Sequence, residues 1–317
     1  MRKQKYPFEV AMVLSSNGLI MLRPTEIEEG LTSPVAPDFI RDCHIYMITK
    51  RCRVSLNPDF IYHDDEYICG ELLFHKIQEK IKKVFRISKR NFSADSHSFH
   101  VSEYPHANLV IRDRTGVIRY NIPASTFIRI FEGDFDNLLD VEVLYIGQGY
   151  GKKGARSALE RLKNHSTLQK IQADVISHDP DSEILLILIQ YDEPSLFMIT
   201  SGKDEPTISG DQGYINLIRA INEKIDDGDM ITIAEAGLIR YFQPKYNQVY
   251  KDSFPSTNNK SLQKCQDLDF IALFVELKTS ILGVKVYAQN INPSFYHMAY
   301  YDLHNEQSRK SFFDLLQ

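Results

Sequence analysis

The sequence contains no tryptophan, and only four of its 317 residues are cysteines. These are Cys43, Cys52, Cys69 and Cys265, and none of them belongs to a Cys-x-x-Cys pair. A closed zinc site is therefore not expected, and nothing requires a disulfide framework. Reduced thiols are typical of the cytoplasm, so we expect a cytoplasmic protein.

The chain also lacks a long apolar run and an excess of positive charge. No apolar segment reaches the roughly 18 to 20 residues of a membrane-spanning helix, so we expect no membrane partner. Near the N-terminus the apolar stretch is short and interrupted by Glu9, which favours a strand over a signal peptide. The net charge of −5 excludes a protein coated in positive charge, but it leaves room for a local basic groove.

Short β-branched and aromatic runs separated by turn residues fill the first third of the sequence. FEVAMVL, CHIYMIT, ANLVIRD and GVIRYNI predict strands, and residues 1–114 are expected to form a β-rich accessory or recognition region. One helix is predicted over residues 72–90, because Leu73, Ile77, Ile81 and Val84 recur at helical spacing. Its other face carries a charge of +6 over fifteen residues, which suits either a nucleic-acid backbone or a solvated helix face.

From Val141 onwards, predicted strands and helices alternate. VEVLYIG predicts a strand, ARSALERLKNH a helix, and EILLILIQY a strand covered on both faces. INLIRAINEKI and ITIAEAGLIRYFQPKYN predict two helices, the second ending before Pro244. FIALFVEL and GVKVYAQ predict later strands, and SRKSFFDLL a short helix. The sequence as a whole indicates an α/β (α+β) protein.

A glycine-rich loop links the first strand and helix of this part. Gly149, Gly151 and Gly154 fit G-x-G-x-x-G, a pattern that lets backbone approach a dinucleotide pyrophosphate. The mid-chain position and the two lysines inside the motif are atypical, and the acidic residue expected about twenty positions later would be Asp174. A flexible strand-to-helix turn is the other interpretation of the same residues.

The residues that flank the loop occur in the order of a known nuclease family. The relevant segments are LYIGQG with Tyr145, ERLKNH with Arg161 and His165, and AEAGLIRYFQPKYN with Glu235 and Asn247. On these motifs, residues from about 141 to 247 resemble the GIY-YIG nuclease superfamily. The resemblance implies a small mixed sheet flanked by helices.

We assign that nuclease-like domain to residues 115–260, and the strands and helix of residues 261–317 are expected to pack on it. Ninety residues separate Tyr145 from Glu235, so an insertion near residues 192–230 is expected. The GIY strand should lie just upstream of Tyr145. The nearest candidates are VIRYNI, with Tyr120, and FIRIF, which has Phe127 and Phe131 but no tyrosine.

The resemblance also implies an activity, the hydrolysis of phosphodiester bonds with one divalent metal ion. Glu235 would be the ligand of Mg²⁺ (or Mn²⁺), since hard cations prefer carboxylate oxygen. Arg161, with Arg156 as the alternative, would bind phosphate. Tyr145 and His165 would relay the proton of the attacking water, and Asn247 would brace the helix of Glu235.

The expected partner is nucleic acid, with double-stranded DNA favoured by family precedent, and the predicted contact patch consists of Lys152, Lys153, Arg156 and Lys163. Each candidate also has an ordinary interpretation as a strand, helix-surface or turn residue. Glu235 is the exception, because a charge inside the apolar stretch ITIAEAGLI needs a partner. Two other functions remain open. One is an inactive nucleic-acid-binding module of the same fold, and the other is a nucleotide-binding protein that uses the glycine-rich loop.

Overall fold

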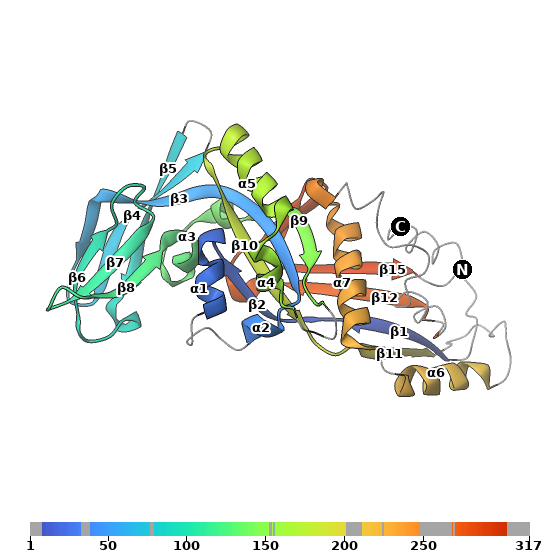
Figure 1. Cartoon of the computed structure of the whole chain (residues 1–317). Coiled ribbons are helices and arrows are strands. Elements are labelled where there is room, and N and C mark those ends of the chain that lie inside the picture. Colours follow the sequence, from blue (N-terminus) through green and yellow to red (C-terminus); the bar gives the residue numbers. More distant parts are fainter. Residues whose placement is uncertain are drawn as a thin grey trace.

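The computed structural model describes residues 8–302, except 33–38, 77–78, 152–153, 155, 201–210, 224, 248–267 and 269. It is a mixed α/β fold with three sheets, one of them curled into half a barrel, so the predicted fold class is confirmed at this level (Figure 1). Two short helices, α1 (Ile27–Thr32) and α2 (Phe39–Asp42), lie in the N-terminal part of the chain. The last predicted helix, SRKSFFDLL, lies outside the described residues.

The largest sheet has eight strands. Its main path is β14 (Ile291–Ser294), β13 (Val286–Ala288), β9 (Val141–Gln148), β3 (Ile45–His63), β10 (Ser182–Tyr191) and β2 (Ser16–Leu22). β3 has 19 residues, well beyond the usual strand length of about 3 to 10. Its first half pairs with β9 and β10, and its second half pairs with β4 (Tyr67–Lys76), which in turn pairs with β5 (Glu79–Ser88).

The second half of β3 belongs to a unit with its own core, formed by residues 52–139. A three-stranded sheet of β6 (Ser96–Val101), β7 (Asn108–Asp113) and β8 (Ile118–Pro123) belongs to it, as do α3 (Ala124–Phe127) and short 3₁₀ turns. Phe74, Phe85 and Phe131 are among its buried side chains. The expected boundary at residue 114/115 falls in the turn between β7 and β8, which pair in one sheet.

The helix predicted over residues 72–90 is wrong, because most of this segment forms the antiparallel strands β4 and β5. Leu72 and Phe74 are buried on one face of β4, and Phe85 and Ile87 on the same face of β5. This two-residue alternation decides the structure. Val84, which the helical pattern placed on an apolar face, is 58% exposed.

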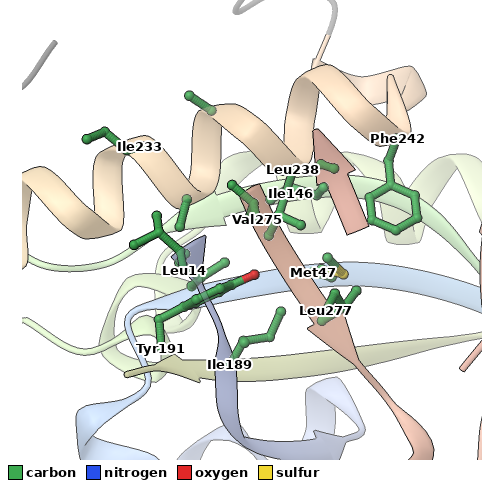
Figure 2. Close-up of a cluster of buried hydrophobic side chains, with 14 of the residues drawn as sticks. Leu14, Met47, Ile146, Ile189, Tyr191, Ile233, Leu238, Phe242, Val275 and Leu277 are labelled. Atoms are coloured by element: carbon green, nitrogen blue, oxygen red, sulfur yellow. The ribbon is translucent and has the colours of Figure 1, made fainter. Parts of the chain in front are cut away.

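A four-stranded sheet forms the other end of the molecule, in the order β11 (Ser195–Thr200), β1 (Phe8–Leu14), β12 (Ala272–Lys278) and β15 (Tyr296–Asp302). The helices α6 (Gln212–Asn222) and α7 (Asp227–Phe242) lie beside it. α7 covers a core shared by both large sheets, to which its Ile233 and Leu238 belong, and Figure 2 shows Leu238 next to Val275 of β12 and Ile146 of β9. The helices and strands predicted in this part of the sequence are confirmed.

The opposite face of the β9–β3–β10 sheet is covered by α4 (Ala158–Lys163) and α5 (Ser166–His178). Leu159, Leu162 and Ile171 are fully buried against Ile48 and Leu186. No helix in the described part of the chain is long and apolar enough to span a membrane. Cys43, Cys52 and Cys69 are free thiols, and Cys265 lies outside the described residues.

Candidate active site

Two tyrosines and a histidine meet on the helix-covered face of β3 and β9. The strands pair with Tyr46 opposite Gly147 and Ile48 opposite Tyr145, so the two tyrosines lie diagonally across the strand pair. Their ring centroids are 6.2 Å apart, and the centroid of His165 lies 5.5 Å from Tyr46 and 5.3 Å from Tyr145. All three side chains are buried.

Gly147 allows this arrangement because it has no side chain. A Cβ atom at this position would lie 2.5 Å from the hydroxyl oxygen of Tyr46 and 2.8 Å from a ring carbon of Tyr145. No larger residue fits there without displacing the rings. The glycine at the end of Tyr-Ile-Gly is thus required by the packing of the two tyrosines.

His165 caps the N-terminus of α5, and this fixes the tautomer of its ring. Its Nδ1 accepts a hydrogen bond from the backbone N–H of Leu168 at 3.1 Å, so the ring proton resides on Nε2. Nε2 therefore donates to the hydroxyl oxygen of Tyr46, at 3.0 Å. Burial, followed by the positive charges of Arg161 and Arg156, lowers the pKa of His165 to about 4. The imidazole is neutral at pH 7.

Glu235 lies in the middle of α7, and its side chain is buried. It accepts hydrogen bonds from the backbone and side chain of Gln148, at the end of β9, and it feels the charge of Arg161. Its Oε2 has no hydrogen-bond partner among the described residues. Burial, only partly offset by Gln148 and Arg161, raises the pKa of Glu235 to about 8. A buried carboxylate oxygen without a partner is costly unless a proton or a cation satisfies it.

Asn247 ties the end of the α7 segment to the tyrosine strand. Its Oδ1 accepts from the backbone N–H of Ile146 at 2.9 Å, and its Nδ2 donates to the carbonyl of the same residue at 2.8 Å. Asn247 is 1% exposed. Because Pro244 and a 3₁₀ turn connect it to α7, these bonds hold the helix of Glu235 in register with Tyr145.

Arg161 and Arg156 line an open cavity of about 500 Å³ next to these groups. The cavity is bounded by the end of β9, the glycine-rich loop and the start of α7, and Gln148, Tyr150, Asp226 and Asp229 also line it. The charge of Arg161 lowers the pKa values of both His165 and Glu235, so its guanidinium lies within electrostatic range of both groups. An anionic group in the cavity would meet both arginines.

The three lysines of the predicted nucleic-acid patch are not among the described residues that line this cavity. Lys163 forms an ion pair with Glu28 at 3.2 Å and does not line this cavity. Lys152 and Lys153 lie outside the described residues. The predicted nucleic-acid patch is therefore represented at the cavity by Arg156.

The glycine-rich loop serves the packing of α4. A Cβ on Gly149 would lie 2.5 Å from the carbonyl oxygen of Ser157, while Gly151 and Gly154 have positive φ values of 67° and 78°. Ser157 and Glu160 form a capping box that occupies the first N–H groups of α4. The carboxylate of Asp174 accepts from the hydroxyl of Tyr246. These contacts favour the interpretation of the loop as a structural turn over a pyrophosphate site.

Neither segment predicted to hold the second tyrosine lies beside Tyr145, and the tyrosine that does, Tyr46, was not among the candidates. Tyr120 lies in β8 of the separate 52–139 unit, where its hydroxyl accepts from the N–H of Ser93. FIRIF forms helical turns and no strand. The strand beside Tyr145 is CHIYMIT, in which His44-Ile45-Tyr46 mirrors Tyr145-Ile146-Gly147. Only Tyr and Ile correspond, in reversed order, since His44 stands where the reversed pattern has Gly147.

The groups present fit a single divalent cation held by few protein ligands. No group of three or more His, Cys, Asp or Glu side chains suited to a metal ion occurs among the described residues. Mg²⁺ does not need such a cage, because it keeps several waters and is often bound through one or two carboxylates. The unpartnered Oε2 of Glu235 is a suitable first ligand.

Comparison with family models, with curated proteins and with solved structures found no match for this chain.

Proposed function

We propose that this protein is a metal-dependent endonuclease of the GIY-YIG type that hydrolyses phosphodiester bonds, with double-stranded DNA as the substrate. The observation that carries the proposal is the pairing of β3 with β9. It places Tyr46 opposite Gly147 and Ile48 opposite Tyr145, with the ring of His165 in contact with the rings of both tyrosines. In this assignment β3 provides the GIY strand, and the 52–139 unit is inserted between the two tyrosine strands.

Each group has a role that its surroundings support. His165 is neutral and donates its Nε2 proton to Tyr46, which polarises that hydroxyl and holds it in one orientation. Tyr46 or Tyr145 then orients the attacking water and takes part in moving its proton. The guanidinium of Arg161, supported by Arg156, neutralises charge that develops on the phosphate oxygens.

Glu235 would hold the cation. When bound, Mg²⁺ or Mn²⁺ supplies Lewis-acid stabilisation of the phosphate and leaving oxygens. Burial of the carboxylate keeps its pKa high in the absence of that charge, and a bound cation favours the ionised form. Asn247 acts as a positioning residue, because it fixes the segment that carries Glu235 to the backbone of Ile146.

The test is nicking of supercoiled plasmid DNA by purified wild type in Mg²⁺ or Mn²⁺, compared with Glu235→Gln. Loss of one transition-state group costs about 10² to 10³ in rate, and loss of the carboxylate ligand should cost at least that. The matched control is Asp140→Asn, because Asp140 is also a carboxyl whose pKa is raised by burial but lies outside the site.

Nicking by wild type and the Asp140 variant, but not by the Glu235 variant, supports the proposal. Equal nicking by all three contradicts the assignment of Glu235. DNA binding without cleavage in either metal contradicts the nuclease and favours an inactive binding module. Retention of an adenine nucleotide by the purified protein would favour the nucleotide-binding alternative.

A further inference from the structure

The sheet of the 52–139 unit has one buried and one open face. Its inner face packs on the core of that unit. Its outer face, as defined by cross-strand pairs, consists of Arg53, Ser55 and Tyr62 of β3, Tyr67, Cys69, Glu71, Leu73 and His75 of β4, and Lys80, Lys82, Val84, Arg86 and Ser88 of β5. We call these residues the outer face.

Positive charge dominates the outer face. It carries four cations, Arg53, Lys80, Lys82 and Arg86, against the single carboxylate of Glu71. Glu71 is largely buried and pairs with Lys82 at 3.5 Å. Two carboxylates from outside the three strands also approach, Glu132 to Arg86 and Asp181 to Arg53.

Lys80 has no carboxylate partner in the described part of the chain, and its charge is felt by its neighbours. The pKa of His75 is lowered by burial and then by the charges of Arg53 and Lys80. His75 accepts a hydrogen bond from the guanidinium of Arg53 and forms another with the hydroxyl of Ser55. An imidazole that accepts from a guanidinium is neutral, so His75 adds no positive charge to the outer face. Cations are thus concentrated where Arg53, His75 and Lys80 lie side by side across three strands.

Protection of a sheet edge explains only part of this pattern. Lysines on an edge strand such as β5 prevent pairing with other chains. Arg53, however, lies on β3, which is paired on both sides in this region. A cation there serves no edge, and the outer face as a whole is suited to bind an extended anion.

The outer face is connected to the candidate active site by a single strand. Arg53 comes seven residues after Tyr46 on β3, a separation of about 23 Å at the rise of an extended strand. Duplex DNA rises 3.4 Å per base pair, so this separation corresponds to about seven base pairs. Because side chains alternate along β3, Tyr46 and Arg53 lie on opposite faces of the strand, and a nucleic acid held at Tyr46 and Glu235 would have to pass around β3 to reach the first cations of the outer face.

We infer that the outer face binds the sugar-phosphate backbone of duplex nucleic acid on one side of the cleavage site; this rests on the proposed nuclease function. A single-stranded platform would present aromatic rings at the centre of the sheet. The middle of β4 instead carries Cys69, Glu71 and Leu73. The ring of Tyr67, at the start of β4, is covered by the guanidinium of Arg86 at 4.1 Å from its centroid, and the cations line the strands on both sides. Contacts of this kind position the duplex without reading its sequence.

The test compares two triple variants in binding assays without divalent cation, so that cleavage does not enter. The first is Lys80→Gln, Lys82→Gln, Arg86→Gln, in which glutamine keeps hydrogen-bonding capacity toward Glu71 and Glu132. The second removes three exposed cations distant from the outer face, Arg219→Gln, Arg240→Gln, Lys278→Gln. Both lower the net charge equally. The probe is a 40-base-pair duplex of mixed sequence, with a 40-nucleotide single strand as a second arm.

We expect the first triple variant to bind the duplex about tenfold or more weakly at 0.1 M salt, with the salt slope reduced by up to about 0.9 per lost phosphate contact. The second triple variant should stay within about twofold of wild type. Equal affinity of the two variants, or no duplex binding by wild type, overturns the inference. A loss confined to the single strand overturns the choice of duplex.

The cleavage assay separates this inference from the function on which it rests. If wild type does not cleave plasmid but the first triple variant alone loses duplex affinity, the outer face is a binding surface and the nuclease proposal fails. If wild type cleaves and both variants bind alike, the nuclease proposal stands and the outer face does not bind the duplex.

Discussion

The two halves of β3 place polar side chains in opposite environments. In the first half, Tyr46 and Thr49 are buried, and each has a defined partner, His165 and the carbonyl of Leu185. In the second half, Arg53 and Tyr62 lie on an open face with loose or shared contacts. Buried polar groups are expensive without partners, so those of the first half are constrained by their contacts. The polar side chains of the second half have few fixed contacts, so they can exchange their present partners for others.

The sharpest test of this difference uses one tyrosine from each region. Tyr46→Phe removes the hydroxyl that His165 orients, and we expect the rate of plasmid cleavage to fall by about 10² or more. Tyr120→Phe removes a hydroxyl that only caps the exposed N–H of Ser93, and cleavage should be unchanged. Thermal melts of both variants check that each is folded. Similar cleavage rates for the two variants would show that the hydroxyl of Tyr46 has no role in cleavage.

Two asparagines give the next largest effect, this time on stability. Asn247→Ala leaves the buried N–H and carbonyl of Ile146 without partners, and we expect a loss of about 2 to 4 kcal/mol in the free energy of unfolding. Asn121→Ala removes an exposed bond to Asn108 and should change stability by less than about 0.5 kcal/mol. Urea unfolding measures both. Equal losses would mean that Asn247 is not a bracing residue.

Carboxyl groups of the two regions should respond to pH with opposite signs. The folded-state pKa of Glu235 is raised to about 8, so ionisation opposes folding and stability falls as pH rises from about 4.5 to 8. Glu235→Gln should then raise the Tm at pH 8, without divalent cation, by about 3 to 8 °C. Mg²⁺ or Mn²⁺ should raise the Tm of wild type and not that of the variant.

Asp113 of the 52–139 unit is the opposite case. Hydrogen bonds from Thr115, above all from its side chain, lower the pKa of Asp113 to about 2. Its contribution is therefore present above the ordinary carboxyl pKa and is lost as pH falls toward 2. Asp113→Asn should lower the Tm at pH 8. If Glu235→Gln also lowers the Tm at pH 8, the statement that the buried carboxylate of Glu235 has an Oε2 without a partner among the described residues and destabilises the fold when ionised is contradicted.

The smallest expected effect concerns two histidines and salt. Burial is the first cause of the lowered pKa of both His165 and His75, and neighbouring cations are the second. His75 is only partly buried, so raising NaCl from about 0.05 to 0.5 M should screen Arg53 and Lys80 and raise its pKa. That of His165 should stay near 4. Histidine ring resonances in NMR titrations measure both.

Local patterns predicted the elements whose determinants lie close together in sequence. The apolar run EILLILIQY predicts β10, and the segment around Glu235 predicts α7, whose start is capped by Asp226. The same reasoning failed at residues 72–90, where Leu73 and Val84 fit helical spacing by coincidence. There the buried pairs Leu72–Phe74 and Phe85–Ile87 form only when two strands pack on a common core.

The proximity of some candidate residues could be predicted for the same reason. Tyr145, Arg161, His165 and Glu235 lie on one stretch with recognisable spacing. In the structure the ring of Tyr145 contacts that of His165, and Arg161 lines the cavity and lies within electrostatic range of His165 and Glu235. Tyr46 lies 99 residues before Tyr145, and their proximity depends on strand register. Periodicity carries no information on pairing at that range. The sequence offers only the pair Ile45-Tyr46, which repeats Tyr145-Ile146 in reversed order.

The 52–139 unit leaves the main sheet and returns to it at the same point, because Lys50 pairs with Glu142 in register and in an ion pair of 3.5 Å. For an unstructured loop of this length, bringing the ends together costs about 4 kcal/mol in chain entropy. A loop with its own core brings its ends together when that core forms. The speed at which Tyr46 meets Tyr145 is then set by folding elsewhere, at Phe74, Phe85 and Phe131. Substitutions at those phenylalanines would delay the appearance of activity during refolding, although none of these side chains lines the cavity.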